Sequence, residues 1–430
     1  MSDKLNDIEH TFHISRGEIK KFMRDFHSEM ERGLRGLSSS LAMLPTYAGR
    51  PKGTERGNFL AIDLGGTNLR IAAARLKGRR KMGSYVSDKF VLEKKHITNT
   101  GKALFDFIAS CTRDFMARHK INLKEKHNIG FTFSFPVRKK RISEGILVGW
   151  TKGFSARGVK GKNVVRLLNR SLEKYIPRTS AIAITNDTVS TLVAKSYEDP
   201  CSDVGVILGT GTNACYYEKI SNIEKLQTSG ISSGEMIVNI EWGNFNGFKR
   251  TRFDRALDRA SENPGRQFLE KMVSGLYIGN LAGLILADFW NCIKPKDFKA
   301  EYISEIESDT QKNLPGVNRV LRRFGVQDLG LSERKMVKKI CAMVSVRAAR
   351  LAAAAIASVV TKMDPALAKK HTIAIDGSVY EKHPGFSKLV KLTLKEIFGE
   401  RAANITLKLT KDASCKGAAI VAATLSREER

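Results

Sequence analysis

The chain has 430 residues, 42% of them hydrophobic and 27% charged, and carries a net charge of +29. This length allows one large domain or two ordinary ones, and the composition is that of a soluble globular protein. No apolar run comes near the roughly 18 to 20 residues that cross a bilayer, and residues 1–15 lack a secretory signal pattern, so we expect a cytoplasmic protein that does not contact membranes.

The six cysteines show no metal-ligand spacing, which favours reduced thiols. His10 and His13 have no further ligands nearby and are more typical of a chance surface pair than of a metal site. The basic residues gather in dispersed clusters at 77–81, 138–141, 334–339 and 391–395, without interleaved aromatic residues. Specific nucleic-acid binding is therefore not expected, and a solvated surface that attracts anions in general is favoured.

Helices and strands are predicted to alternate along the chain, which indicates an α/β protein. The first helix is expected over 17–44, where Ile19, Phe22, Phe26 and Met30 recur at steps of three or four residues. Further helices are expected over 102–119, 162–175, 186–196, most of 253–290, 336–363, 386–398 and 416–424. Besides two hairpins, strands are expected near 89–92 and over 129–135, 181–185, 372–375 and 404–409.

The first hairpin, FLAIDLGGTNLRI at 59–71, has a glycine turn between two apolar strands. Its polar and glycine positions are Asp63, Gly65, Gly66, Thr67, Asn68 and Arg70. Glycines let backbone N–H groups approach a phosphate, and a carboxylate can hold the water shell of a metal ion. No helix follows the glycines, so the run is neither a Walker A loop nor a Rossmann fingerprint. Taken alone, an ordinary hairpin turn explains it equally well.

The pattern recurs in VGVILGTGTNACY at 204–216, with Thr210 and Gly211 in the turn and Asn213 after it. Two such hairpins, about 145 residues apart from Gly66 to Gly211, suggest a duplicated core that holds a nucleotide between its copies. A third strand leads into Gly377 and Ser378, a loop that either binds the nucleoside or is simply a turn.

Asp187 follows a predicted strand and opens a predicted helix. It could cap that helix, or it could act as the general base that accepts a hydroxyl proton. Position alone favours the cap, whereas its place beside Asn186 and between the two hairpins favours the base.

Eight segments together carry a resemblance to a known family. They are AIDLGGTN at 61–68, FTFSFP at 131–136, WTKGF at 150–154, TNDT at 185–188, GTGTNACY at 209–216, NIEWG at 239–243, NPGRQ at 263–267 with Glu270 and Lys271 behind it, and DGSVY at 376–380. Each is weak alone, but their order and spacing are specific. From about residue 43 to 419, the chain resembles a eukaryotic-type hexokinase.

This resemblance implies a two-lobed sugar-kinase fold of the actin-like, ribonuclease H-like type, with a duplicated core and a cleft between the lobes. The small lobe is expected to hold residues 57–185 and 415–430, and the large lobe residues 1–56 and 188–414. A hexose would lie at the base of the cleft and ATP across its opening.

By matching position, the resemblance also implies the site. The residues expected around the sugar are Ser134, Phe135, Thr151, Lys152, Asn186, Asp187, Asn213, Glu241 and Glu270. Asp187 would take the proton of the sugar 6-hydroxyl, and Lys152 would offset charge on the transferred group. The expected nucleotide residues are Asp63, Gly65, Gly66, Thr67, Asn68, Arg70, Thr210, Gly211, Gly377, Ser378 and Ser414. Mg²⁺ would be held through ATP phosphates and water near Asp63, without a direct protein cage.

The chain departs from the family pattern at several positions. Ala413 and Cys415 stand where glycines are usual, which could stiffen a hinge or alter the adenosine pocket. Asn280 replaces a common acidic residue, and Leu276 stands at a position that varies.

Three other functions remain open from the sequence. They are a kinase of the same fold with another acceptor, such as an amino sugar, a non-catalytic sugar sensor or actin-like ATP-binding module, and a nucleic-acid binder driven by positive charge. Retention of Asp187, Lys152 and Glu270 argues against a sensor without activity.

Overall fold

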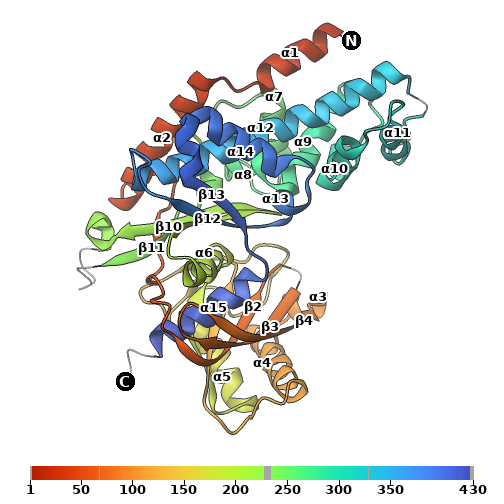
Figure 1. Cartoon of the computed structure of the whole chain (residues 1–430). Helices are drawn as coiled ribbons and strands as arrows, with labels where there is room; N and C mark the ends of the chain where they lie inside the picture. Colours follow the sequence, from red (N-terminus) through yellow and green to blue (C-terminus); the bar gives the residue numbers. More distant parts are fainter. Residues whose placement is uncertain (1, 67, 227–233, 328, 427–430) are drawn as a thin grey trace.

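Two β-sheets form the frame of the protein, in a computed structural model that describes residues 2–66, 68–226, 234–327 and 329–426 (Figure 1). The first sheet has the order β4 (Met82–Val91), β3 (Asn68–Lys77), β2 (Arg56–Leu64), β5 (His127–Phe133) and β8 (Thr179–Thr185). The second has the order β1 (Leu44–Pro45), β11 (Glu235–Asn239), β10 (Thr212–Lys219), β9 (Ser202–Leu208), β12 (His371–Asp376) and β13 (Ile405–Leu409). A small ribbon joins β6 (Val137–Arg138) to β7 (Ile146–Leu147).

The two sheets repeat one topology, as the predicted duplication requires. In the first, β4, β3 and β2 are antiparallel neighbours, and β5 and β8 continue parallel to β2. In the second, β11, β10 and β9 are antiparallel, and β12 and β13 continue parallel to β9. Each predicted glycine hairpin is therefore the first antiparallel pair of its own sheet.

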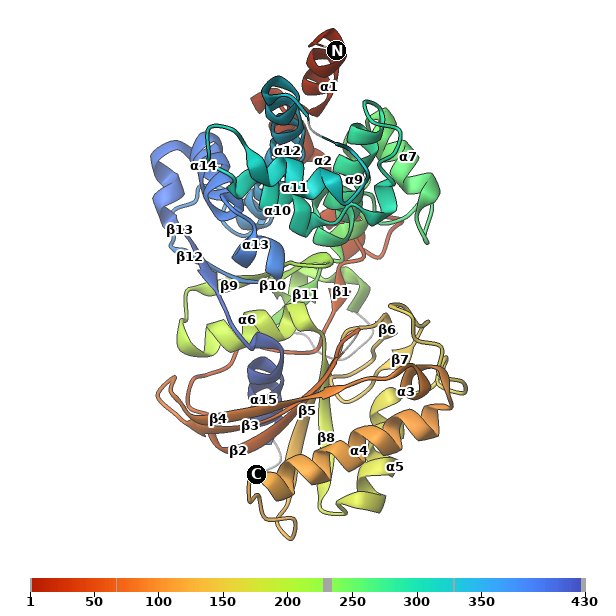
Figure 2. The same cartoon turned by 90° about the vertical axis from the view of Figure 1, so that its right-hand side faces the viewer.

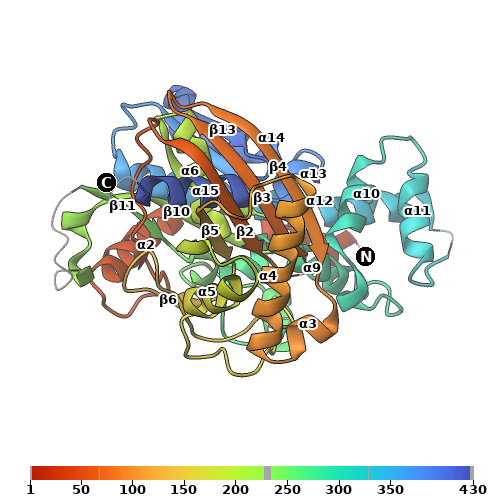
Figure 3. The same ribbon diagram turned by 90° about the horizontal axis from the view of Figure 1, so that it is seen from below.

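Helices cover the outer faces of both sheets and fill the space between them (Figures 1 and 2). The second sheet and its outer face carry α1 (Ser2–Phe12), α2 (Arg16–Leu34), α7 (Arg252–Ala260), α8 (Phe268–Val273), α9 (Gly275–Ala287), α10 (Ala300–Ser308), α11 (Pro315–Arg322), α12 (Leu331–Met363), α13 (Ser378–Lys382) and α14 (Phe386–Phe398). The first sheet is flanked by α3 (Lys94–Thr98), α4 (Gly101–Arg118) and α5 (Val164–Tyr175), and the last two lie side by side in Figure 3. Short 3-10 turns cover Ile220–Asn222, Glu224–Leu226, Trp242–Asn244, Pro295–Asp297 and Gly399–Asn404.

Two helices lie between the sheets. Each helix follows a strand of one sheet but packs on the other sheet. Helix α6 (Asp187–Glu198) follows β8 of the first sheet but packs on β9 of the second. Helix α15 (Ala413–Leu425) follows β13 of the second sheet but packs on β2 and β5 of the first. The two helices also pack on each other, in a core rich in alanine, so this layer joins the two halves (Figure 2).

Two glycines allow α15 to pack this closely. A Cβ on Gly417 would lie 2.0 Å from the carbonyl oxygen of Ser190 on α6, and a Cβ on Gly130 would lie 1.9 Å from that of Ala418. Neither distance is compatible with a real side chain, because the opposing atoms are backbone.

We expect Gly417→Ala to destabilise the protein, although alanine is the better helix former by about 1 kcal/mol. The added methyl group must push α15 from α6, and overpacking of this kind costs roughly 1–3 kcal/mol. Urea unfolding measures the effect. The control is Gly17→Ala in α2, where the nearest atom to a new Cβ is 3.9 Å away, and this change should be neutral or stabilising. Equal stability of the two variants would contradict the close packing.

The predicted first helix is wrong at its end: it stops at Leu34 rather than at Leu44. Gly36 adopts a left-handed φ of +78°, and Glu29 accepts a 2.8 Å hydrogen bond from the hydroxyl of Ser40, which folds the chain back. Residues 44–45 then form β1 and pair with β11. The strand expected near 89–92 is also longer than predicted, since β4 begins at Met82.

Helix α12 contradicts the expectation that no segment approaches the length and apolarity of a membrane span. It is long and apolar enough to cross a bilayer, but 78% of its most apolar window is buried inside the protein. The two arginines in the middle of the helix are paired with carboxylates of other helices: Arg347 with Asp254 at 2.6 Å, and Arg350 with Glu396 at 2.6 Å. Helix α12 is therefore the central core helix of the second half.

Candidate active site

Both glycine hairpins close their turns with a backbone hydrogen bond, and the first turn is one residue longer than the second. The N–H of Gly65 donates to the carbonyl oxygen of Asn68 at 3.1 Å, and the N–H of Gly209 donates to that of Gly211 at 3.0 Å. Each turn therefore closes on itself, at the end of a central strand of its sheet.

Site residues lie directly against both glycine turns. A Cβ on Gly66 would come within 3.1 Å of the Lys152 side chain, and one on Gly211 would lie 2.9 Å from Glu270 Oε2. The third predicted loop meets the second hairpin, since a Cβ on Gly209 would lie 3.3 Å from the Cα of Gly377. Gly377 itself has a φ of +124°. The first two predicted nucleotide loops thus adjoin residues predicted for the sugar, and the third adjoins the second loop.

A hydrogen-bonded group of amides and carboxylates lies beside the second hairpin. The Asn239 side chain donates to Glu241 Oε1 at 2.7 Å, and Asn213 donates to the same oxygen at 3.2 Å and to Asn239 Oδ1 at 2.8 Å. Glu270 Oε2 accepts the backbone N–H of Thr212 at 3.0 Å. Burial raises the pKa values of Glu241 and Glu270, and the charge of Asp187 raises both further. Asn239 is a member of this group that the prediction missed.

Asp187 is the first residue of α6, while Asn186 is the N-cap. The side chain of Asn186 accepts the N–H of Val189 at 2.9 Å, so the capping role first considered for Asp187 belongs to its neighbour. Asp187 Oδ1 accepts the N–H of Thr188 at 2.7 Å, and the structure gives its Oδ2 no hydrogen bond among the described residues. The carboxylate lies at the N-terminal end of α6, where the helix dipole is positive.

Three aspartates from different segments act on one another electrostatically. Burial raises the pKa of Asp63 to about 7, and the charges of Asp187 and Asp376 add to that shift. Burial likewise raises the pKa of Asp376 to about 6, with Asp187 again contributing. Asp376, which the resemblance left without a role, is the last residue of β12 before Gly377, whereas Asp63 lies one residue before the end of β2.

The raised pKa of Asp63 leads to a testable prediction of how the stability of the protein depends on pH. An acid whose pKa is higher in the folded state than in the unfolded state costs stability as the pH rises from about 4 to about 7. We therefore expect Asp63→Asn to raise the melting temperature more at pH 8 than at pH 5. Thermal unfolding of both proteins across this range measures the difference. A constant difference, or one that shrinks with rising pH, would contradict the buried and crowded state of this carboxylate.

Lys152 connects the first hairpin to the predicted sugar residues. Its Nζ donates to the carbonyl oxygen of Ser134 at 2.9 Å and lies 5.5 Å from the ring centroid of Phe135. Its backbone is left-handed, with a φ of 56°, and Gly153 follows at 78°. The positive charge of Lys152 lowers the pKa values of Asp63, Glu241 and Glu270, against the larger opposing effect of burial.

The remaining predicted residues are less closely connected. Arg70 forms an ion pair with Asp412 at 2.6 Å. The prediction missed this partner, which occupies part of the Arg70 guanidinium that was expected to bind phosphate. Ser414 lies in the first turn of α15, where its carbonyl oxygen accepts a hydrogen bond from the hydroxyl of Thr132 at 2.9 Å.

Thr151 and Thr210 are exposed, and Ser378 begins α13. Thr67 lies outside the described residues.

Two family models, both described as hexokinase, match the chain over residues 4–197 and 203–424. The chain belongs to the hexokinase family. Hexokinase-1 of Saccharomyces cerevisiae is 36% identical over 450 residues, covering 98% of this chain and 92% of that protein. Hexokinase-3 of Mus musculus is 38% identical over 439 residues, covering 97% of this chain but 46% of the mouse protein. The chain thus spans about half the length of this mammalian hexokinase.

Solved hexokinase structures have the same fold. The hexokinase from Schistosoma mansoni, complexed with glucose, matches with a TM-score of 0.86 and 34% identity over 98% of both chains. A glucokinase of the ROK family from Streptomyces griseus matches with a TM-score of 0.51 at 15% identity, which supports the fold alone. The predicted two-lobed sugar-kinase fold is confirmed.

The positions that depart from the hexokinase pattern have structural roles here. Ala413 and Cys415 are fully buried, and Cys415 belongs to the core between the two sheets. Asn280 donates to the carbonyl oxygens of Pro295 and Lys296 at 3.0 and 3.1 Å, which a carboxylate could not do. Leu276 is exposed beside the second hairpin, where its N–H donates to the carbonyl oxygen of Thr210 at 3.2 Å.

Proposed function

We propose that this chain transfers the γ-phosphoryl group of ATP to the 6-hydroxyl of a hexose. Glucose is the proposed acceptor, with mannose and fructose as further ones. The observation that carries the proposal is the electrostatic grouping of Asp187 and Lys152 with Glu241 and Glu270, in a chain of the hexokinase family. A glucose complex of the Schistosoma mansoni relative supports the choice of sugar.

The buried polar group around Glu241 suits a sugar ring. Carboxylate oxygens accept hydrogen bonds from sugar hydroxyls, and amide groups both donate and accept. Glu241 and Asn239 already hold each other in place, so the group is pre-organised before a ligand arrives. We assign contacts with the sugar to Ser134, Phe135, Thr151, Lys152, Asn186, Asp187, Asn213, Glu241 and Glu270. A sugar that lacks one of the recognised hydroxyls would leave these groups unpaired, and the site would therefore reject it.

Asp187 is the proposed general base. Its Oδ1 is held by the backbone of α6, so Oδ2 is the oxygen that would receive the proton of the attacking hydroxyl. The O–H bond of the 6-hydroxyl breaks as its oxygen bonds to phosphorus, and the bond from phosphorus to the leaving oxygen of ADP breaks. Lys152 would stabilise the negative charge that spreads over the transferred group.

The nucleotide would be held by the three loops, with Asp63, Gly65, Gly66, Thr67, Asn68, Arg70, Thr210, Gly211, Gly377, Ser378 and Ser414 as its proposed contacts. The residues fit a magnesium–nucleotide complex, because burial and the charge of Asp187 raise the pKa values of Asp63 and Asp376, and a bound cation would favour their charged forms. When bound, Mg²⁺ would neutralise charge on the phosphates. Asp63 would hold its water shell.

We further propose that residues 57–185 and 415–430 form the small lobe and 1–56 and 188–414 the large one, with the protein in the cytoplasm. The packing of α15 on the first sheet and of α6 on the second supports these boundaries. Closure of the lobes on the sugar would exclude water as a competing acceptor.

A coupled assay tests the function. Purified protein with ATP and Mg²⁺ should form ADP only when a hexose is present, and glucose should yield a product that glucose-6-phosphate dehydrogenase oxidises. Glucose, mannose, fructose and an amino sugar are compared at equal concentrations. Activity only with the amino sugar would favour the alternative acceptor, and sugar binding without ADP formation would indicate a sensor. Either result would overturn the proposal.

A further inference from the structure

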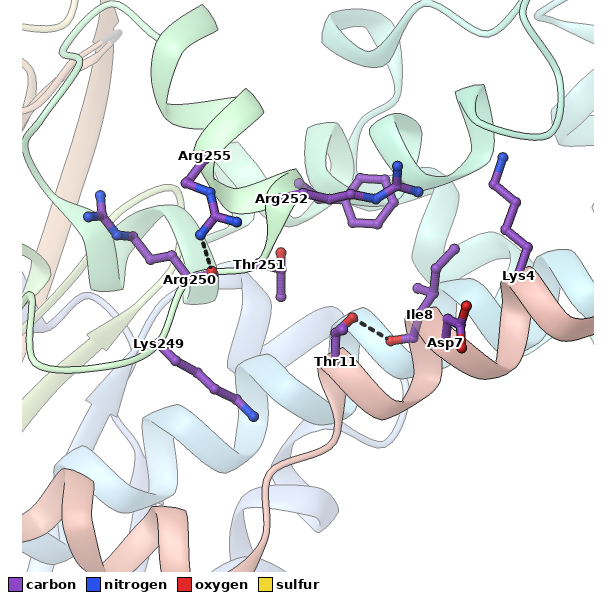
Figure 4. A pocket seen from close by; sticks show the side chains of 10 residues that line it. Lys4, Asp7, Ile8, Thr11, Lys249, Arg250, Thr251, Arg252 and Arg255 are labelled. Atoms are coloured by element: carbon purple, nitrogen blue, oxygen red, sulfur yellow. Dashed lines mark hydrogen bonds between the residues drawn. The ribbon is translucent and has the colours of Figure 1, made fainter.

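A cavity of about 640 Å³ lies in the half of the protein that is built on the second sheet, between helix α1 and the start of helix α7. Its lining residues are Lys4, Asp7, Ile8, Thr11, Lys249, Arg250, Thr251, Arg252, Phe253 and Arg255 (Figure 4). None of them belongs to the candidate active site. The volume is within the range of about 300–1,000 Å³ that is typical of small-molecule sites.

The walls of this cavity carry more positive than negative charge. Five of the lining side chains are cationic and one, Asp7, is a carboxylate. Outside the lining, Asp288 pairs with both Lys4 and Arg252, and Glu18 pairs with Lys249. One carboxylate thus serves two cations, and the site retains an excess of positive charge.

Two of the arginines have no carboxylate partner within the described part of the chain. Arg255 Nη1 donates to the carbonyl oxygen of Arg250 at 2.7 Å, which leaves its other N–H groups for a ligand. The guanidinium of Arg250 stacks 4.1 Å from the ring centroid of Phe268 and is turned away from α1 in Figure 4. Figure 4 shows Arg255 and Arg252 on the α7 side of the cavity and Lys4 on α1, and Arg252 and Lys4 share Asp288 as their carboxylate partner.

The wall that carries these arginines is firmly anchored. Thr251 and Asp254 form a reciprocal capping box at the start of α7. Asp254 also accepts two hydrogen bonds, at 2.8 and 2.6 Å, from the buried Arg347 of the core helix α12. Ile8 and Phe253 are nearly fully buried and provide an apolar base to the cavity. A rigid, concave and cationic wall of this kind differs from the dispersed basic clusters elsewhere in the sequence.

We propose that this cavity is a second binding site, separate from the active site, for a small molecule that carries two or more phosphate groups. Adjacent arginines are suited to phosphates because a guanidinium presents paired donors to phosphate oxygens. The spread of Lys4, Arg252 and Arg255 around one space matches several linked anionic groups better than a single one. The hydroxyls of Thr11 and Thr251 line the same space.

The test uses inorganic tripolyphosphate as the probe, titrated calorimetrically into the full chain at about 0.15 M ionic strength, where long-range attraction is screened. Three proteins are compared: the unchanged chain, Arg252→Glu with Arg255→Glu, and the control Lys388→Glu with Lys391→Glu. The control lysines are exposed on α14 and form no ion pair among the described residues, and they change the net charge equally. The candidate phosphate loops are identical in all three proteins, so any binding there contributes equally.

We expect the cavity variant to bind the probe roughly tenfold or more weakly, and the control to bind it as the unchanged chain does. Equal weakening of both variants would mean that only net charge matters, and no weakening of either would mean that the probe binds elsewhere. Both results would overturn the proposal. Circular dichroism checks the fold. If the double reversal unfolds the protein, Arg252→Gln with Arg255→Gln replaces it, with an expected weakening of about threefold to tenfold.

Discussion

Replacing Asp187 by asparagine should lower kcat for hexose phosphorylation by about 10²- to 10⁴-fold, the usual contribution of a positioned general base. The side chain keeps its size and its oxygen at Oδ1, but an amide cannot accept the proton that leaves the 6-hydroxyl. The measurement is the steady-state rate of ADP formation with saturating glucose and ATP.

The fold should tolerate this change. The hydrogen bonds that Asp187 accepts from Thr188 can still be accepted by the amide oxygen of asparagine, and the cap of α6 is supplied by Asn186. Glu198→Gln is the matched control, because it makes the same acid-to-amide change at the other, exposed end of the same helix. Its activity should stay near that of the unchanged chain.

The outcome also separates a base from a binding group. If Asp187 only binds sugar, the asparagine variant would raise KM for glucose while kcat stays nearly constant. A kcat within a few-fold of the original would therefore exclude the role of base, even if glucose affinity fell. A lower kcat together with an unchanged melting temperature would support the role of Asp187 as the base.

Local sequence was sufficient to predict the parts of the fold that short-range chemistry decides. The two glycine hairpins, helix α14 at Phe386–Phe398 and strand β12 all lie where apolar periodicity and turn residues indicate. The repeat of Gly-Thr-Asn predicted a duplicated core, and the two sheets share one topology. Such features depend on a few consecutive residues, so they can be inferred without knowledge of distant contacts.

The errors came from interactions that lie outside the local pattern of a single helix or strand. Helix α2 ends early because Glu29 bonds to the serines that follow, and no periodicity in the helix reveals that contact. Asp412 lies far from Arg70 in sequence, yet the two form an ion pair beside the first hairpin. Arg347 and Arg350 of α12 likewise find their carboxylate partners, Asp254 and Glu396, on other helices.

The same reason explains why the roles of Asn239 and Asp376 were missed. Both stood in segments that carried the family resemblance, but their importance depends on what they face. Asn239 holds Glu241, and Asp376 shares an electrostatic environment with Asp63 and Asp187. The sequence explains the positive charge of the chain only as a surface that attracts anions in general, and the cavity beside α7 provides a specific hypothesis for part of it.

Replacing Lys152 by methionine should lower kcat by roughly 10²- to 10³-fold, the usual effect of removing one donor that stabilises transition-state charge. The measurement is kcat and KM for glucose and for ATP in separate titrations. Lys152 is exposed, so methionine preserves the length of the side chain without leaving a buried cavity. The hydrogen bond to the carbonyl oxygen of Ser134 is lost, which affects the loop more than the core.

The kinetic pattern decides what Lys152 does. If it stabilises the transferred group, kcat should fall while KM for glucose changes little, whereas a residue that only orients Ser134 would raise KM for glucose. Lys160→Met, an exposed lysine a few residues further along the same loop, is the control and should retain full activity. Lys152→Arg should recover only part of the loss, because a planar guanidinium places its donors differently from the compact ammonium group of lysine. Complete recovery by arginine would mean that positive charge alone is sufficient and that the close fit of lysine against the hairpin has no catalytic consequence.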